Sequence, residues 1–340
     1  MPTIKDVARE AGVSIATVSY VLNQRDDMVG EQTRQHVLQI AQKLGYKPNI
    51  VARNLQSSST SLLGYAWHKH PEDQPNLVMD QFIYHLAHAA EQLGYHLLTF
   101  THPSDNPTSV YQDLIASRRV DGFILANTQL DDPRIHFLMK SGVPFVSFGR
   151  ANPSWSFNWV DTDGQDGTRQ ATEYLLSLGH RRIAFLGWPR DSLTGNYRLD
   201  GYLCALQRAE ITVDEDFIIR NDYKNHSIDK AFDRWLSRPQ AQQPTAILAV
   251  SDFVAVAAMR AAEQRGLQVG HQLSIIGFDD APFVRYLKPG LTTLRQPFAE
   301  ITRCLVDQLH CMIRGEGVAR LERLFSPQLI LRDSTGPAPR

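Results

Sequence analysis

Four charged side chains stand where they could hold a small polyhydroxylated molecule. Arg150, Asp252 and Asp279 each come directly after an apolar run that reads as a strand. Arg198 lies near the start of a predicted helix. A guanidinium and a carboxylate can each bind two neighbouring hydroxyl groups through paired hydrogen bonds. This chemistry favours a sugar over a purely apolar ligand.

The motifs of common catalytic and metal sites are missing from the sequence. There is no GxSxG elbow, no P-loop and no GxGxxG after a strand. The pairs His68 with His70 and His85 with His88 have no accompanying carboxylate or cysteine cluster, so exposed histidines are favoured over metal ligands. We therefore expect no enzymatic reaction, no metal and no cofactor.

Composition indicates an ordinary globular chain of two or three domains. Of its 340 residues, 43% are hydrophobic and 21% are charged, and the formal net charge is -1. Any nucleic-acid site must therefore be local. The three cysteines form no CxxC pair, and the first twenty residues have no apolar core of a signal peptide. No stretch of eighteen apolar residues could span a membrane, so we expect a cytoplasmic protein.

The first sixty residues contain three short helical patterns and no strand. Thr3 and Asp6 form a capping box for the first helix, Gly12 ends it, and Ser14 can cap the second. From Leu62 onward, β-rich runs alternate with amphipathic helices, including helices near 77–93 and 108–117. About ten such strands, nearly continuous in apolar residues, predict an α/β fold of two lobes with doubly wound parallel sheets.

The second helix has the surface of a helix that reads DNA. Val18, Val21 and Leu22 point to one side. Small, polar and aromatic residues form the other side: Ile15, Ala16, Ser19, Tyr20 and Asn23. A helix-turn-helix places such a helix in the major groove. Periodicity alone would equally fit a three-helix packing module without DNA.

The amino-acid sequence resembles that of the lac repressor and gal repressor family of bacterial transcription regulators. The resemblance begins in IKDVAREAGVSIATVSYVLN and TRQHVLQIAQKLGYKPNIVARNL and continues through LLSLGHRRIAFLG, YRLDGY, AVSDFVAVAAM, IIGFDD and LTTLRQPF. It implies a helix-turn-helix headpiece over 1–48, a hinge helix and linker over 49–60, and a periplasmic-binding-protein-like domain over 61–332. Its N-lobe would comprise about 61–160 and 294–322, and its C-lobe about 161–293 and 323–332. A flexible tail over 333–340 would follow.

The resemblance also assigns DNA contacts. Ile15 and Ala16 match the two variable positions that choose operator bases. Further matching positions in the headpiece and hinge are Thr3, Ser14, Thr17, Ser19, Asn23, Thr33, Tyr46, Asn49 and Ala52. Tyr20 replaces the arginine that most members carry there, and arginine is the usual reader of guanine in the major groove. The preferred base at that step is therefore expected to differ.

A hinge of seven residues, Asn49 to Leu55, is too short to be a stable isolated helix in water. Two hinges meeting on an operator could fold together. Leu55 matches the leucine that wedges into the minor groove and kinks the duplex. The alternative for Leu55 is a linker leucine buried against the lobe.

The ligand is expected where the carboxyl ends of the strands of both lobes meet. Arg198 and Asp279 match the family's principal effector contacts. Arg150 and Asp252 are further candidates from their positions after strands. Gln296 matches a crossover position that touches ligand in some members. Four aromatic residues complete the expected site: Trp67, Phe82, Tyr223 and Phe253. For each aromatic residue a core role is the alternative. Asp280 is expected to be structural.

The leading hypothesis is a transcriptional regulator that acts as a repressor. Its affinity for operator DNA would be controlled by a mono- or oligosaccharide. A purine or other non-sugar effector is one alternative, a carbohydrate-binding transport module a second, and an α/β enzyme acting on a carbohydrate a third. A palindromic operator implies a homodimer. The segment after SPQLILR has no leucine heptads, so no tetramerising helix is expected.

Overall fold

A computed structural model describes residues 2–22, 28–46, 59–67, 76–220 and 227–339. These residues form two compact units, and the division along the chain falls between Thr60 and Ser61. Each unit has its own hydrophobic core. The first unit carries the helix-turn-helix pattern, and the second carries both predicted lobes.

The first unit consists of three helices, α1 (Ile4–Ala11), α2 (Ile15–Leu22) and α3 (Glu31–Lys43). The predicted capping box of α1 is confirmed, because the Asp6 carboxylate accepts hydrogen bonds from the backbone N–H and the hydroxyl of Thr3 at 2.9 and 2.8 Å. Gly12 ends α1 with φ of 64°, a left-handed conformation that costs glycine little. The tight turn into α2 follows from this glycine.

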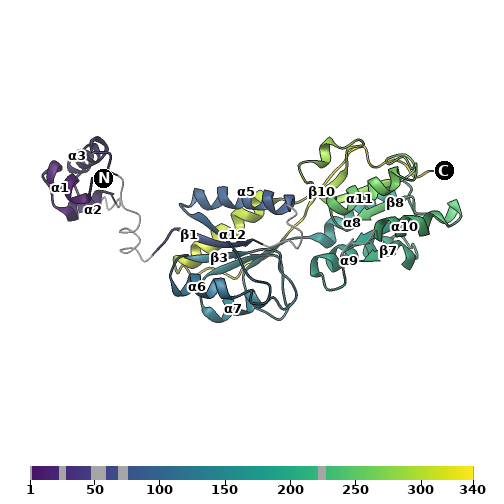
Figure 1. The fold of residues 1–340 in the computed structure, drawn as a ribbon, viewed down its shortest axis with the longest axis horizontal. Coiled ribbons are helices and arrows are strands. Elements are labelled where there is room, and N and C mark those ends of the chain that lie inside the picture. The colour runs from purple at the N-terminus through teal and green to yellow at the C-terminus, as the bar shows by residue number, and fades with distance from the viewer. Residues whose placement is uncertain (1, 23–27, 47–58, 68–75, 221–226, 340) are drawn as a thin grey trace. The chain divides into compact units, whose positions relative to one another are not determined.

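The N-lobe contains a sheet of six described strands in the order β11-β5-β4-β3-β1-β2, with all pairs parallel. The strands are β1 (Leu62–Trp67), β2 (His96–Thr101), β3 (Gly122–Leu125), β4 (Phe145–Phe148), β5 (Trp159–Thr162) and β11 (Glu322–Phe325). Helices α5 (Leu77–Gln92) and α12 (Phe298–Ile313) cover one face, and α6 (Ser109–Ala116) and α7 (Pro133–Ser141) the other (Figure 1). The predicted helices near 77–93 and 108–117 are confirmed as α5 and α6.

The C-lobe contains a second sheet of six described strands in the order β12-β10-β9-β8-β6-β7, parallel except for β10 with β12. The strands are β6 (Ile183–Gly187), β7 (Ile218–Arg220), β8 (Ala246–Ala249), β9 (Ser274–Asp279), β10 (Thr292–Arg295) and β12 (Gln328–Ile330). The helices are α8 (Gly164–Ser177), α9 (Leu193–Arg208), α10 (Ser227–Leu236) and α11 (Asp252–Glu263), with short 3₁₀ turns at Glu215–Phe217, Gln240–Gln242 and Val284–Tyr286. The predicted α/β class with two parallel-sheet lobes is confirmed.

The chain passes between the sheets three times, after β5, after β10 and after β11. The expected boundaries at 160, 294 and 322 lie a few residues too early, because β5 and β11 pair in the N-lobe sheet through Thr162 and Phe325. β10 belongs to the C-lobe sheet up to Arg295. The carboxyl ends of β5, β10 and β11 therefore lie where the chain crosses from one lobe to the other.

The expectation of a flexible tail over 333–340 is wrong for its described part. Ser334 is fully buried, and its hydroxyl accepts from the N–H of Thr292 and donates to the carbonyl of Ile275, at 2.8 and 2.6 Å. The buried His180 ring contacts the carbonyl of Gly336 at 3.0 Å through Nε2. The proline, glycine and serine content of this segment favoured disorder. These backbone and hydroxyl hydrogen bonds instead hold it against the C-lobe.

Candidate functional site

Helix α2 leaves one face available in the headpiece. Val18 and Val21 are buried in the three-helix core, whereas Ile15 is 46% exposed and Ala16 is exposed. The Ser14 hydroxyl accepts from the Thr17 N–H at 3.0 Å and lies 2.8 Å from the Thr17 hydroxyl, so Ser14 starts the helix as predicted. The separation of core and free faces is that of a groove-reading helix.

The remaining predicted DNA contacts divide between surface and core. Thr3 is exposed at the start of α1, and Ser19, Tyr20 and Thr33 are half-buried. Tyr46 packs against the headpiece core, so its ring also has a structural role. Four predicted contacts lie outside the described residues: Asn23, Asn49, Ala52 and Leu55.

Arg198 is the central cation of the candidate effector site. It is buried on α9, with its guanidinium 3.5 Å from the centroid of the Phe278 ring and 5.1 Å from that of Trp188. One terminal nitrogen donates to the carbonyl of Val250, and the other lies 3.7 Å from Asp279 Oδ1. Its Nε is buried and has no hydrogen-bond partner among the residues that the structure describes. A buried unpaired donor is costly, so this N–H is available for a ligand oxygen.

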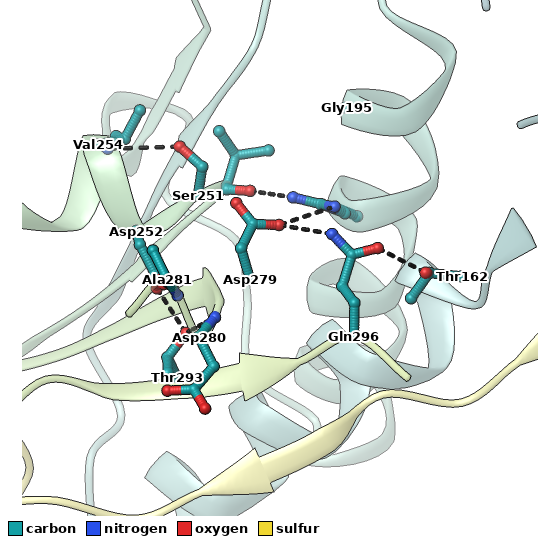
Figure 2. A network of polar contacts seen from close by, with 12 residues as sticks. Thr162, Gly195, Ser251, Asp252, Val254, Asp279, Asp280, Ala281, Thr293 and Gln296 are labelled. Atoms are coloured by element: carbon teal, nitrogen blue, oxygen red, sulfur yellow. Dashed lines mark hydrogen bonds and ion pairs between the residues drawn. The ribbon is translucent and has the colours of Figure 1, made fainter. Parts of the chain in front are cut away.

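Asp279 and Gln296 join the carboxyl ends of β9 and β10 (Figure 2). Gln296 Nε2 donates to Asp279 Oδ1 at 2.7 Å, and Gln296 Oε1 accepts from the Thr162 hydroxyl at 2.6 Å. Thr162 ends β5 in the N-lobe. The amide therefore links a C-lobe carboxylate to the end of an N-lobe strand.

Two residues that sequence reasoning missed complete this region, Asp161 and Tyr197. Asp161 lies in β5, and its Oδ2 accepts from Arg150 Nε at 2.9 Å. Tyr197 precedes Arg198 in α9, and its ring centroid is 3.5 Å from the Arg150 guanidinium. β5 has four residues, so no apolar run marked it as a strand, and nothing in its spacing indicated that Asp161 pairs with Arg150.

Burial dominates the electrostatics of these groups. It raises the pKa of the Asp279 carboxyl to about 6, although Arg198 and the Gln296 hydrogen bond act in the opposite direction. It also raises the pKa of Asp161, with Arg150 opposing the change. It lowers the pKa of Arg198, whose charge Asp279 and Asp161 support. Because two carboxylates accompany two guanidiniums, the arrangement is suited to a neutral polar ligand.

Asp252 is not free to bind a ligand, which corrects the sequence prediction. It begins α11 and is buried. Oδ2 accepts from the N–H of Ala281 at 2.7 Å, and Oδ1 accepts from the Thr293 hydroxyl at 2.5 Å (Figure 2). Asp252 therefore holds the segments that follow β9 and precede β10. The structure gives it a supporting position behind Asp279.

Phe82 is likewise a core residue. It lies in the middle of α5, is fully buried, and stacks on Phe148 with ring centroids 4.7 Å apart. Phe298 packs edge-on against both rings. The alternative of a core role is therefore the correct one for this aromatic residue.

The other aromatic candidates differ in exposure. Trp67 ends β1, is half-buried, and lies edge-on to Tyr65. Phe253 is 68% exposed in the first turn of α11. Tyr223 lies outside the described residues. Asp280 is structural as expected, because its two oxygens pair with Arg295 and Arg332 at 2.7 and 2.5 Å.

Over the described ranges, the chain has neither a metal-binding cluster nor a membrane-spanning helix. Within them, no group of three His, Cys, Asp or Glu side chains could hold a metal ion. No helix in the same ranges is both long enough and apolar enough to cross a membrane.

A helix-turn-helix headpiece and a two-lobed binding domain define the class of ligand-responsive DNA-binding regulators. Comparison with known proteins agrees with this class. Residues 3–49 match the family described as bacterial regulatory proteins of the lacI family, and residues 172–335 match a periplasmic binding protein-like domain. The chain is 32% identical over 345 residues to the HTH-type transcriptional repressor PurR of Proteus mirabilis, covering 100% of this chain and 98% of that protein.

Two solved structures extend the similarity to nearly the whole chain. One is the transcriptional regulator CelR in complex with cellobiose, at 30% identity, TM-score 0.73, and coverage of 98% of this chain and 100% of that one. The other is the lac repressor dimer bound to operator and the anti-inducer ONPF, at 30% identity, TM-score 0.80, and coverage of 98% and 99%. The chain belongs to the LacI family of bacterial transcription regulators and is not an enzyme.

Proposed function

We propose that this protein is a repressor whose operator affinity is controlled by a sugar bound between its lobes. The observation that carries the proposal is the buried group of Arg198, Asp279 and Gln296, in which Arg198 Nε has no partner within the described ranges of the chain. Guanidinium, carboxylate and amide offer donors and acceptors at fixed positions, as vicinal hydroxyl groups require. The CelR neighbour is a complex with cellobiose, which supports the same ligand class.

The proposal places the DNA-reading surface on α2, with Ile15, Ala16 and Tyr20 toward base edges and Ser14 and Thr17 toward the backbone. Exposure of Ile15 and Ala16 supports this assignment. The headpiece is small, and two headpieces on a palindromic site would supply the buried area that specific binding needs. We therefore propose a homodimer that acts in the cytoplasm, in line with the lac repressor dimer on its operator.

The proposal is tested in two measurements on the purified full chain. In vitro selection from random duplexes first identifies an operator. Isothermal titration calorimetry then screens mono- and disaccharides, with nucleobases and nucleosides as the competing ligand class. A sugar that binds and changes operator affinity at least fivefold supports the proposal. Binding of a purine alone, or a ligand without any effect on operator affinity, would overturn it.

A further inference from the structure

One contact joins the lobes without running through the three chain passages. Arg150 follows β4 in the N-lobe, and its guanidinium lies 3.5 Å from the ring centroid of Tyr197, on α9 of the C-lobe. A cation over an aromatic face at this distance is attracted by the ring quadrupole. The contact therefore resists separation of the two lobes at this point.

The Arg150 side chain and the helix that carries Tyr197 are each anchored in their own lobe. Arg150 Nε donates to Asp161 Oδ2 at 2.9 Å, and the Arg150 carbonyl accepts from the Thr128 hydroxyl at 2.8 Å. On the other side, α9 packs so closely on α8 that a Cβ on Gly201 would lie 2.0 Å from the carbonyl oxygen of Gln165. Because Arg150 is anchored in the N-lobe and α9 in the C-lobe, the distance between the guanidinium and the Tyr197 ring depends on how far apart the lobes are.

The Arg150 side chain is also oriented for this contact. Asp161 takes the Nε edge of the guanidinium, which leaves the planar face free to lie against the ring. The Trp159 ring centroid is 5.8 Å from the same guanidinium and belongs to the N-lobe. Arg150 therefore has an aromatic neighbour in each lobe, and the C-lobe one is nearer.

We infer that Tyr197 is a positioning residue of the cleft, which holds Arg150 against the C-lobe and favours the closed arrangement of the lobes. Arg198, the next residue on the same helix, carries the Nε of the candidate effector site that no described residue pairs with. Closure of the lobes through Tyr197 therefore determines how wide the cleft is beside Arg198. The inference rests on the proposed function in one respect, which is that the effector is the ligand whose binding is coupled to this closure.

The test measures lobe separation in the ligand-free full chain. Donor and acceptor dyes are attached through non-canonical amino acids at Lys140 on α7 and Glu263 on α11, both exposed, with the native cysteines left in place. Labelled protein is mixed with excess unlabelled protein, so that energy transfer occurs within one chain. Single-molecule energy transfer then gives the populations of short and long separations.

We expect Tyr197→Ala to shift the ratio of closed to open molecules about fivefold toward open, which corresponds to about 1 kcal/mol. Tyr197→Phe retains the ring and should keep the wild-type ratio. A structural role alone would lower the urea midpoint of Tyr197→Ala and leave the ratio unchanged. An unchanged ratio, or equal shifts for Ala and Phe, would overturn the inference. Since no sugar is added, failure of the sugar screen leaves this result interpretable.

Discussion

The side-chain amide of Gln296 donates to Asp279 Oδ1 at 2.7 Å, at the point where the chain leaves the C-lobe sheet. The same amide accepts from Thr162 in the N-lobe sheet. A change in the charge or hydrogen bonding of Asp279 therefore acts directly on Gln296, at one of the segments that connect the two lobes. This arrangement gives the candidate effector site a physical connection to lobe geometry, which allosteric coupling requires.

Asp279→Asn should weaken sugar binding about 10- to 150-fold, because a charged hydrogen-bond acceptor is replaced by a neutral amide. Operator affinity without sugar should stay at the wild-type value, since the headpiece is a separate compact unit. Fluorescence anisotropy on the selected operator, with and without the sugar from the screen, measures both quantities. An unchanged sugar response would remove Asp279 from the site.

Asp252→Ala should reduce stability without a direct effect on ligand contacts. The substitution leaves the N–H of Ala281 and the hydroxyl of Thr293 buried without their acceptor, at a cost of about 1–3 kcal/mol for each group. Urea unfolding of the full chain measures this loss. The matched control is Phe253→Ala, whose exposed side chain should change stability by less than about 0.5 kcal/mol. Equal midpoints for the two variants would contradict the supporting role of Asp252.

Stability should also depend on the protonation of Asp279. Burial raises the pKa of this carboxyl from 3.8 to about 6, so between these values the folded chain holds a proton that the unfolded chain has released. The unfolded state then binds fewer protons, and the contribution of Asp279 to stability is present at low pH and lost as the pH rises to about 6.

The measurement is the urea midpoint of wild type and Asp279→Asn at half-unit steps from pH 4 to 7. Asp161 and Asp252, whose pKa values are also raised by burial, remain in both proteins. Because the charge of Asp279 also raises the pKa of Asp252, the difference between the two curves measures Asp279 together with its interaction with Asp252. We expect the wild-type stability to fall more steeply with rising pH than that of the variant. Parallel curves would show that Asp279 does not titrate in this window.

The sequence predicted the class of each unit because periodicity survives in long helices and apolar strands. It also placed Asp279 in the ligand site, since residues after parallel strands meet at one edge of a sheet. Arg198, near the start of a helix, joined that site through the resemblance to the family's effector contacts. Asp252 occupies an equivalent position after β8, but in the folded chain Ala281 and Thr293 donate hydrogen bonds to its two oxygens. Phe82 illustrates the same limit, because an aromatic residue on an amphipathic helix fits a core or a cleft equally well.

Two features had no local signal at all. The short strand β5 was missed, and Asp161 with it, because four residues between polar neighbours do not form a recognisable apolar run. The stacking of Arg150 on Tyr197 joins segments 47 positions apart, and its existence depends on the relative placement of two lobes. Pairings of this kind are set by tertiary packing, which spacing along the chain does not encode.

Tyr20 provides the last prediction, which concerns operator sequence. This residue lies on α2 close to the exposed Ile15 and Ala16 and is half-buried, at a position where the resemblance to the family implies arginine. Arginine donates two parallel hydrogen bonds to guanine O6 and N7, which tyrosine cannot do. Tyr20→Arg should therefore shift the selected operators toward guanine at one step in each half-site, by about 1–3 kcal/mol.

Binding-site selection with both proteins, followed by competition anisotropy on the two preferred duplexes, measures this shift. Leu38→Ala is the matched control, because this side chain is 42% exposed on α3 rather than on the reading helix. It should leave the selected sequence unchanged. If Tyr20→Arg and wild type select the same base at every position, Tyr20 makes no contribution to base recognition, and specificity must come from Ile15, Ala16 and the flexibility of the DNA itself.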